Sequence, residues 1–171
     1  MKQPIDQYNK MYRLATNAHC NQKYGDKPYT FHLKQVDTLV TEVNSTDQIL
    51  ECCSYSSIDP SDDYVYGDAV WTLKTIALGH DLIEDTTVTQ DQLKTLGFSE
   101  IVISAISDLS KKEGQTKKDY LDNLCKNPWA RCVKKADSFA NLLNSLKDGR
   151  VKGIKKYTHN LQILGGVEDV W

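Results

Sequence analysis

Four side chains that could bind a metal ion or move a proton lie close together in the sequence: His80, Asp81, Glu84 and Asp85. His80 and Asp81, the His-Asp pair, precede Glu84 and Asp85 by four positions each. On a helix, residues four positions apart project to the same side. Apolar residues surround these groups and anchor the segment to a core. Charges grouped there are costly unless something compensates them, and a bound cation would do so. A solvated acidic turn at a helix end is the alternative.

Two more residues with ligand chemistry lie on otherwise apolar helical faces. They are His32, after an aromatic stretch, and Asp137, in the segment Val133–Leu142. With the His-Asp pair they would supply two imidazoles and two carboxylates. Such a mixed nitrogen and oxygen set suits Mn, Fe, Co, Ni or Zn better than Ca²⁺. The sequence therefore predicts a transition-metal site with four ligands: His32, His80, Asp81 and Asp137.

These residues and their flanks resemble the HD-domain metal-dependent phosphohydrolases. The similarity is greatest to the alarmone hydrolase branch, which comprises the hydrolase domain of RelA/SpoT homologues and the stand-alone small alarmone hydrolases. Residues 18–32 resemble a stretch that ends in P-Y-x-x-H, residues 79–86 resemble L-H-D-x-x-E-D-T, and residues 134–142 resemble K-x-A-D-x-x-x-N-L. The motifs occur in the family's order and the resemblance covers about residues 10–145.

The resemblance implies a metal-dependent nucleotide phosphohydrolase that removes the 3′-pyrophosphate of guanosine tetra- or pentaphosphate. Manganese is the expected metal, and Glu84 and Asp85 resemble the family's catalytic carboxylates, which orient the attacking water or handle its proton. Asn141 is similar to a residue that contacts the nucleoside sugar. Lysines could neutralise the phosphates, although each could equally be a solvated surface residue; the candidates are Lys23, Lys27, Lys111 and Lys134.

Several features depart from the family's pattern. Gly79 replaces the leucine that usually precedes the His-Asp pair, which would loosen that helix end. The stretch Ser45–Gly67 is longer than in the smallest relatives, and the first basic segment is short. The synthetase region of the bifunctional relatives is absent from this sequence, so only hydrolysis is implied. His19 could be a pocket residue or a structural histidine. Tyr29 could stack on a base or pack against the core, and we expect packing.

Two other functions remain open. The first is hydrolysis of another nucleotide that bears a 2′- or 3′-phosphate. The second is a non-catalytic nucleotide-binding HD module. The pair Glu84-Asp85 favours an enzyme, because a module that only binds has no reason to keep both carboxylates beside all four ligands.

Apolar residues recur at three- and four-residue steps almost everywhere, which predicts an all-α, compact HD-domain helical bundle. Helices are expected over about residues 5–22, 31–43, 48–53, 66–80 and 154–164, with further helices between. Thr89 and Gln92 form a capping-box pattern, and Gly97 is placed to end the helix that follows. Further N-caps are expected at Ser99, Thr116 and Asn127.

Length and composition set the remaining limits. The 171 residues predict a single domain over 1–171, and 40% hydrophobic with 26% charged residues is ordinary for a globular chain. The net charge of −2 argues against a binder of duplex nucleic acid. No apolar run reaches the roughly 18 residues of a membrane span, and the N-terminus lacks the apolar part of a signal peptide. We therefore expect a cytoplasmic protein that binds a small nucleotide, with no membrane partner; the pattern says nothing of oligomeric state.

The five cysteines agree with the expected cytoplasmic location. Their number is odd and the sequence contains no C-x-x-C. A chain of this length can bury a core without disulfides. All five are expected to be reduced and structural.

Overall fold

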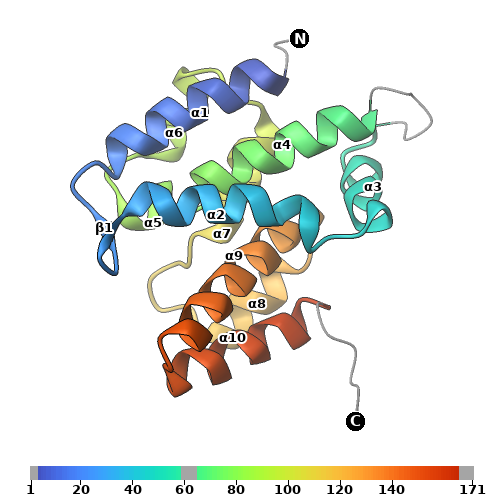
Figure 1. The fold of residues 1–171 in the computed structure, drawn as a ribbon. Coiled ribbons are helices and arrows are strands. Elements are labelled where there is room, and N and C mark those ends of the chain that lie inside the picture. The colour runs from blue at the N-terminus through green and yellow to red at the C-terminus, as the bar shows by residue number, and fades with distance from the viewer. Residues whose placement is uncertain (1–3, 59–64, 166–171) are drawn as a thin grey trace.

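The computed structural model describes residues 4–58 and 65–165. Within these residues the regular secondary structure is helical apart from one short hairpin (Figure 1), which confirms the predicted all-α class. The helices are α1 (Pro4–Ala18), α2 (Tyr29–Glu42), α3 (Thr46–Tyr55), α4 (Val65–Gly79), α5 (Leu82–Asp85), α6 (Gln90–Thr95), α7 (Glu100–Leu109), α8 (Lys117–Leu124), α9 (Pro128–Lys147) and α10 (Val151–Ile163). The strands are β1 (Lys23–Tyr24) and β2 (Lys27–Pro28).

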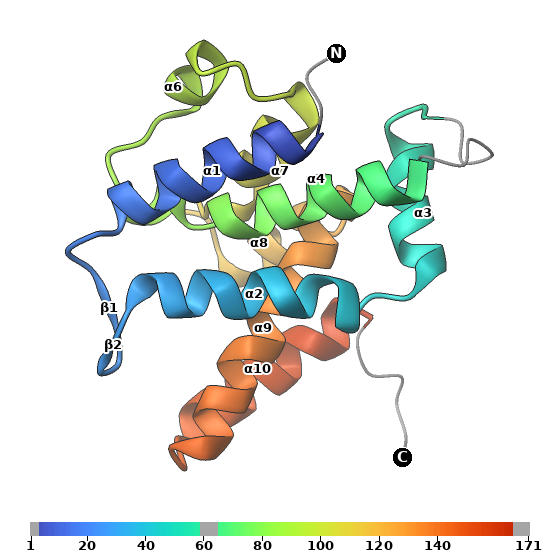
Figure 2. The ribbon, with the colours of Figure 1, turned by 45° about the horizontal axis from the view of Figure 1, so that its top comes forward.

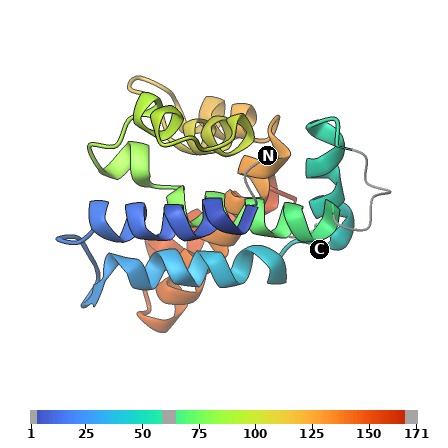
Figure 3. The ribbon, with the colours of Figure 1, turned by 90° about the horizontal axis from the view of Figure 1, so that it is seen from above.

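Helix α4 lies at the centre of the bundle. It contacts α1, α2, α3, α7 and α9, and Figure 2 shows it between α1 and α2. Most of its C-terminal half is buried, which fits an almost uniformly apolar helix. Helix α9 crosses beneath α2 and carries α10 along its side. Seen from above, the segment α6–α8 lies on the opposite side of α1 from α2 (Figure 3).

The helix starts follow from local side-chain chemistry. The side chains of Ser99, Thr116 and Asn127 accept hydrogen bonds from the first-turn amides of α7, α8 and α9. Thr89 and Gln92 form the predicted capping box, and Gly97 follows α6 in the left-handed conformation. Each cap satisfies backbone N–H groups that a helix leaves without partners. These predictions are confirmed.

The first helix is shorter than the sequence indicates. We expected it to reach about residue 22, but α1 ends at Ala18 and a two-stranded hairpin follows. Lys23 pairs with Pro28 across a turn in which Gly25 has φ +64. Glycine adopts this left-handed conformation without steric cost, so the turn depends on it. A hairpin of two residues per strand is too short to show alternation in the sequence.

The chain breaks its helical path at the His-Asp pair. Helix α4 ends at Gly79 and α5 begins at Leu82, so His80 and Asp81 lie at a junction rather than within one continuous helix. Asp81 leaves the helical region with φ −102 and ψ 1. Its carbonyl still accepts from the Asp85 amide at 2.8 Å, so the four-residue spacing survives between these two acidic residues.

Gly79 lies where three helices approach closely. A Cβ atom added there would lie 2.7 Å from Cδ1 of Ile106 and 2.8 Å from Sδ of Met11. Both side chains are fully buried. Glycine at this position therefore allows α4 to pack closely against α1 and α7, because their side chains fill the space that a leucine would occupy.

We predict that Gly79→Leu lowers the free energy of unfolding by about 1–3 kcal/mol, the usual cost of overpacking a closed core. The matched control is Gly67→Leu in the same helix, where an added Cβ meets nothing within 4 Å. Leucine is the better helix former, so this control should be neutral or slightly stabilising. Urea denaturation of the two variants measures the difference, and equal stabilities would contradict the packing argument.

Two further features concern the whole chain. No helix in residues 4–58 and 65–165 has the length and apolar character needed to cross a membrane. The five cysteines are free, as expected, although Sγ of Cys52 lies 3.9 Å from Sγ of Cys132. Helix α3 occupies part of the long stretch Ser45–Gly67, while residues 59–64 lie outside the described residues.

Candidate metal centre and adjoining cleft

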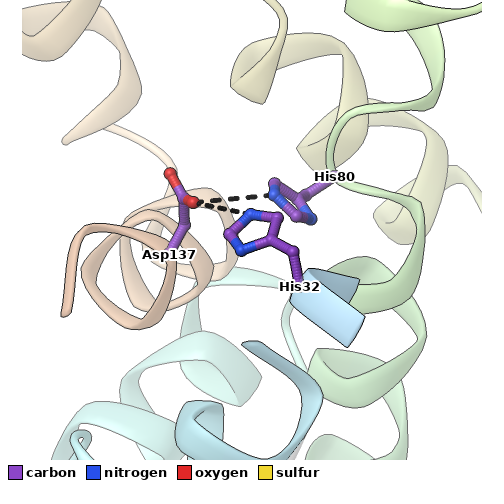
Figure 4. Close-up of side chains that lie close together, drawn as sticks. All are labelled: His32, His80 and Asp137. Atoms are coloured by element: carbon purple, nitrogen blue, oxygen red, sulfur yellow. Dashed lines mark ion pairs between the residues drawn. The ribbon is translucent and has the colours of Figure 1, made fainter. Parts of the chain in front are cut away.

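Three side chains from distant parts of the sequence converge in the interior. Figure 4 shows His32 from α2, His80 from the α4–α5 junction and Asp137 from α9 pointing toward one another. Oδ1 of Asp137 lies 3.2 Å from Nε2 of His32 and 3.7 Å from Nε2 of His80. One ligand atom of each residue lies within 4.8 Å of the others. All three residues are buried.

The fourth predicted ligand lies beside them. Oδ2 of Asp81 is 2.8 Å from Nε2 of His80 and 3.9 Å from Nε2 of His32. The fold therefore brings together all four residues that the sequence predicts as ligands. Two ligand atoms bound at about 2.0–2.2 Å to one ion are separated by roughly 3–3.5 Å. The distances between the histidine nitrogens and the carboxylate oxygens, 2.8 to 3.9 Å, lie close to that separation.

The orientation of His80 is suited to metal binding. Nδ1 lies 2.8 Å from the carbonyl oxygen of Ala77, which can only accept, so Nδ1 carries the hydrogen. The lone pair of the neutral ring is then on Nε2, which faces the acidic residues. Nε2 is buried, and its nearest polar neighbours are the carboxylate oxygens of Asp81 and Asp137. A backbone acceptor that fixes the tautomer is the usual support of a metal-bound histidine.

Asp137 is held by two neighbours on its own helix. Its Oδ2 pairs with Nζ of Lys134 at 2.9 Å, and its Oδ1 accepts from Nδ2 of Asn141 at 2.6 Å. Although burial disfavours the charged form, Lys134 and the two histidines hold the pKa of Asp137 well below its usual range. The carboxylate therefore stays ionised.

When no metal is bound, a proton on His80 supplies part of the positive charge that the carboxylates of Asp81 and Asp137 attract. Burial disfavours a charged imidazole, but Asp81 and Asp137 outweigh that cost and raise the pKa of His80 to about 10. Burial likewise opposes ionisation of Asp81, but His80 lowers its pKa to about 2. The centre thus attracts positive charge, and its residues fit a divalent ion.

The two candidate catalytic carboxylates lie on α5 and are exposed. Oε2 of Glu84 accepts from the backbone N–H of Lys111 at 3.2 Å. Oδ2 of Asp85 lies 3.2 Å from the hydroxyl of Tyr29, and the Asp85 carbonyl accepts from Nε2 of Gln22 at 2.6 Å. Contacts from other segments thus fix the short helix.

Aromatic rings pack around the centre. Tyr24 stacks on His32 with ring centroids 4.6 Å apart, and His19 stacks on Tyr29 at 4.5 Å. His19 is buried, and its Nδ1 lies 2.6 Å from Oε1 of Gln22. Burial and the carboxylates of Asp81 and Asp85 raise the pKa of Tyr29, so its hydroxyl stays protonated.

A cleft of about 280 Å³ adjoins the metal centre. Asp137 and Glu84 form part of its wall, so the candidate metal site and one candidate catalytic carboxylate open onto the same space. The remaining lining includes four lysines that would attract an anionic ligand: Lys111, Lys117, Lys134 and Lys156.

The cleft includes only some of the predicted substrate residues. Lys134 and Asn141 line it, as does Lys111. Lys23 and Lys27 lie in the hairpin and are not among its lining residues; Nζ of Lys27 lies 3.6 Å from the centre of the Phe31 ring.

Sequence reasoning missed the contribution of the last helix. Helix α10 supplies three lining residues beyond the part of the chain that carries the motifs: Lys156, Tyr157 and Asn160. Asn160 is 3% exposed and its Oδ1 has no partner among the described residues. The one feature of the sequence that could have indicated this contribution is Asn160, a polar residue on the apolar face of a helix. His159, on the same helix, is exposed.

Comparison with known proteins identifies the fold. No protein-family model matches the chain, and no curated protein matches its sequence. Among the solved structures that match is one from work describing a metazoan ortholog of SpoT that hydrolyses ppGpp and plays a role in starvation responses, with a TM-score of 0.60. The match covers 94% of this chain and 83% of that chain at 19% sequence identity. The two chains share a fold. The fold that the motif resemblance implied is therefore confirmed.

We predict that metal binding to the chelator-stripped protein tightens as pH rises. In that state the pKa of His80 is about 10, so the imidazole carries a proton at neutral pH and must lose it before Nε2 can bind an ion. Displacement of one proton per ion gives roughly a tenfold gain in affinity per pH unit below that pKa. Competition with a chelator of known proton affinity measures the slope. A flat profile from about pH 7 to pH 9 would contradict a protonated His80.

Proposed function

We propose that this protein is a metal-dependent nucleotide phosphohydrolase that removes the 3′-pyrophosphate of guanosine tetra- or pentaphosphate. The observation that carries the proposal is the lysine-lined cleft, which opens onto both Asp137 of the candidate metal centre and Glu84 of the acidic pair. A ligand with several phosphates fits that charge pattern, because each lysine makes a point-charge contact to a phosphate oxygen. The fold shared with a ppGpp-hydrolysing protein supports the same substrate class.

His32, His80, Asp81 and Asp137 would hold the ion. A divalent ion bound there would lower the pKa of a water molecule and polarise a phosphoryl oxygen. Imidazole and carboxylate ligands together suit a first-row transition metal, and among these we propose manganese because the resemblance to the alarmone hydrolases implies it. The hydrogen bond from Nδ1 of His80 to Ala77 would keep the ring in the ligating tautomer.

The chain's own groups would carry out the remaining steps. Water forms a bond to the phosphorus attached to the 3′-oxygen, and the bond from that phosphorus to the 3′-oxygen breaks. Glu84 and Asp85 would orient the water and accept its proton, and a proton is returned to the departing 3′-oxygen. Lys134 and Lys156 would hold the pyrophosphate group, whose charge increases as the bond breaks.

The deciding experiment is hydrolysis by purified, manganese-loaded protein of a panel of nucleotides. The panel contains guanosine tetraphosphate, guanosine pentaphosphate and nucleotides with a single 2′- or 3′-phosphate. Release of pyrophosphate from the first two supports the proposal, and His80→Ala should abolish both metal content and turnover. Preference for the monophosphates would favour the second enzyme hypothesis. Binding without turnover of any nucleotide would favour the non-catalytic module.

We predict that Glu84→Gln and Asp85→Asn each lower kcat by about 10²–10⁴-fold, the range for a positioned acid or base. Metal content and substrate affinity should stay near the wild-type values, because neither residue is among the proposed ligands. A loss confined to kcat marks an interaction made in the transition state. Steady-state kinetics with elemental analysis separates the two effects. Wild-type turnover in both variants would reduce the pair to an acidic turn.

We also predict that Lys156→Ala raises KM for guanosine tetraphosphate roughly tenfold, because it removes one charged contact in the cleft. The control is Lys155→Ala, which removes the same charge from the adjacent position of α10 but is not among the cleft's lining residues. Comparing the two at several salt concentrations separates a direct contact from a general field effect. Equal KM values for the two variants would remove α10 from the substrate site.

A further inference from the structure

One hydroxyl group links two acidic residues of the candidate site. Oη of Tyr29 donates to Oδ2 of Asp81 at 2.6 Å and lies 3.2 Å from Oδ2 of Asp85. A tyrosine hydroxyl has a single proton, so the shorter contact marks Asp81 as the main acceptor. The two contacts join the first residue of α2 to the α4–α5 junction and to the last residue of α5.

We propose that Tyr29 is a positioning residue of the active site. Its hydroxyl holds the carboxylate of Asp81 in place for the metal and the carboxylate of Asp85 in place for the attacking water. This assignment rests on the proposed function, and it gives one side chain a role in both metal binding and turnover.

The ring of Tyr29 has little freedom to move. His19 stacks on it with an interplanar angle of 14°, and the His32 ring meets it edge-on with centroids 5.7 Å apart. Aromatic pairs in these arrangements are favourable beyond the area that they bury. The hydroxyl is therefore held at a fixed point relative to His32, which is itself a proposed ligand.

The helix that bears Asp85 cannot fix the carboxylate by itself. Helix α5 has four residues, and so short a helix is not stable without outside contacts. In residues 4–58 and 65–165, the Tyr29 hydroxyl is the only donor at hydrogen-bond distance from the Asp85 carboxylate, and it shares its one proton between this oxygen at 3.2 Å and the nearer Oδ2 of Asp81. Gln22 binds the Asp85 carbonyl instead, which places the backbone but leaves the side chain free. Among the described residues, the shared contact with Tyr29 is therefore the one hydrogen bond that can orient the Asp85 carboxylate.

The competing explanation is that Tyr29 only packs in the core. Its stacked contacts with His19 agree with packing, but packing would need the ring and not the hydroxyl. Tyr29→Phe keeps the ring and removes the hydroxyl, so it separates the two roles. Tyr8→Phe is the matched control, because Oη of Tyr8 also donates to a half-buried carboxylate, Oδ2 of Asp37 at 3.1 Å, outside the candidate site.

The first measurement is manganese affinity, determined by competition with a chromophoric chelator. We expect Tyr29→Phe to bind about 10–100-fold more weakly, the usual effect of removing a hydrogen bond to a metal ligand. Tyr8→Phe should stay within about twofold of the wild type. Wild-type affinity in Tyr29→Phe would overturn the inference. A wild-type protein that binds no divalent ion would instead contradict the proposed metal site.

The second measurement is a double-mutant cycle at saturating manganese. Tyr29→Phe should lower kcat at least tenfold with little change in KM. In the Asp85→Asn background the same change should have a clearly smaller effect, because the group that the hydroxyl positions has already lost its charge. Additive losses would overturn the link through Asp85. Thermal melting of each variant without metal confirms that the fold is intact, and a fall in kcat matched by loss of folded protein would support packing alone.

Discussion

The constraint on which the centre depends is the grouping of two carboxylates and two imidazoles where water has little access; Asp81 is the most open of the four, with a side chain 18% exposed. Asp137 is 5% exposed and the two histidines are less exposed still. Ionised carboxylates in such a place need compensating positive charge. The chain supplies it with Lys134 and with a proton on His80, and a divalent ion would supply more. Because the groups come from α2, the α4–α5 junction and α9, the centre exists only when these helices are docked against one another.

Three of the four proposed ligands are each oriented by hydrogen bonds with different neighbours. The carbonyl of Ala77 orients His80, Lys134 and Asn141 hold Asp137, and the Tyr29 hydroxyl reaches Asp81. Asn141 in turn accepts from Tyr24, whose ring stacks on His32. Loss of one support would therefore affect one ligand most strongly. The acidic pair on the short α5 differs, because the hydrogen bonds to the Glu84 and Asp85 carboxylates come from other segments.

The sequence predicts those features that depend on neighbouring residues or on side-chain type. The caps at Ser99, Thr116 and Asn127 follow from the few residues on either side, so they could be predicted. The four ligand residues could be predicted because polar groups on apolar helical faces are costly to bury unless something compensates them. The cleft could not be predicted, because its far wall forms only when α10 packs along α9. The close packing around Gly79 could not be predicted either, because it depends on side chains of α1 and α7 that are distant from Gly79 in the sequence.

Three of the contacts that orient the site end on main-chain atoms: the carbonyls of Ala77 and Asp85 and the amide of Lys111. Every amino acid carries these atoms, and proline lacks only the amide hydrogen. Exchange of the side chain at position 77 or 111 therefore leaves the main-chain contact available. A lineage can replace most of such a sequence and still aim its reactive groups in the same directions, provided that the path of the backbone is kept. A shared fold at 19% identity is the outcome that this freedom allows.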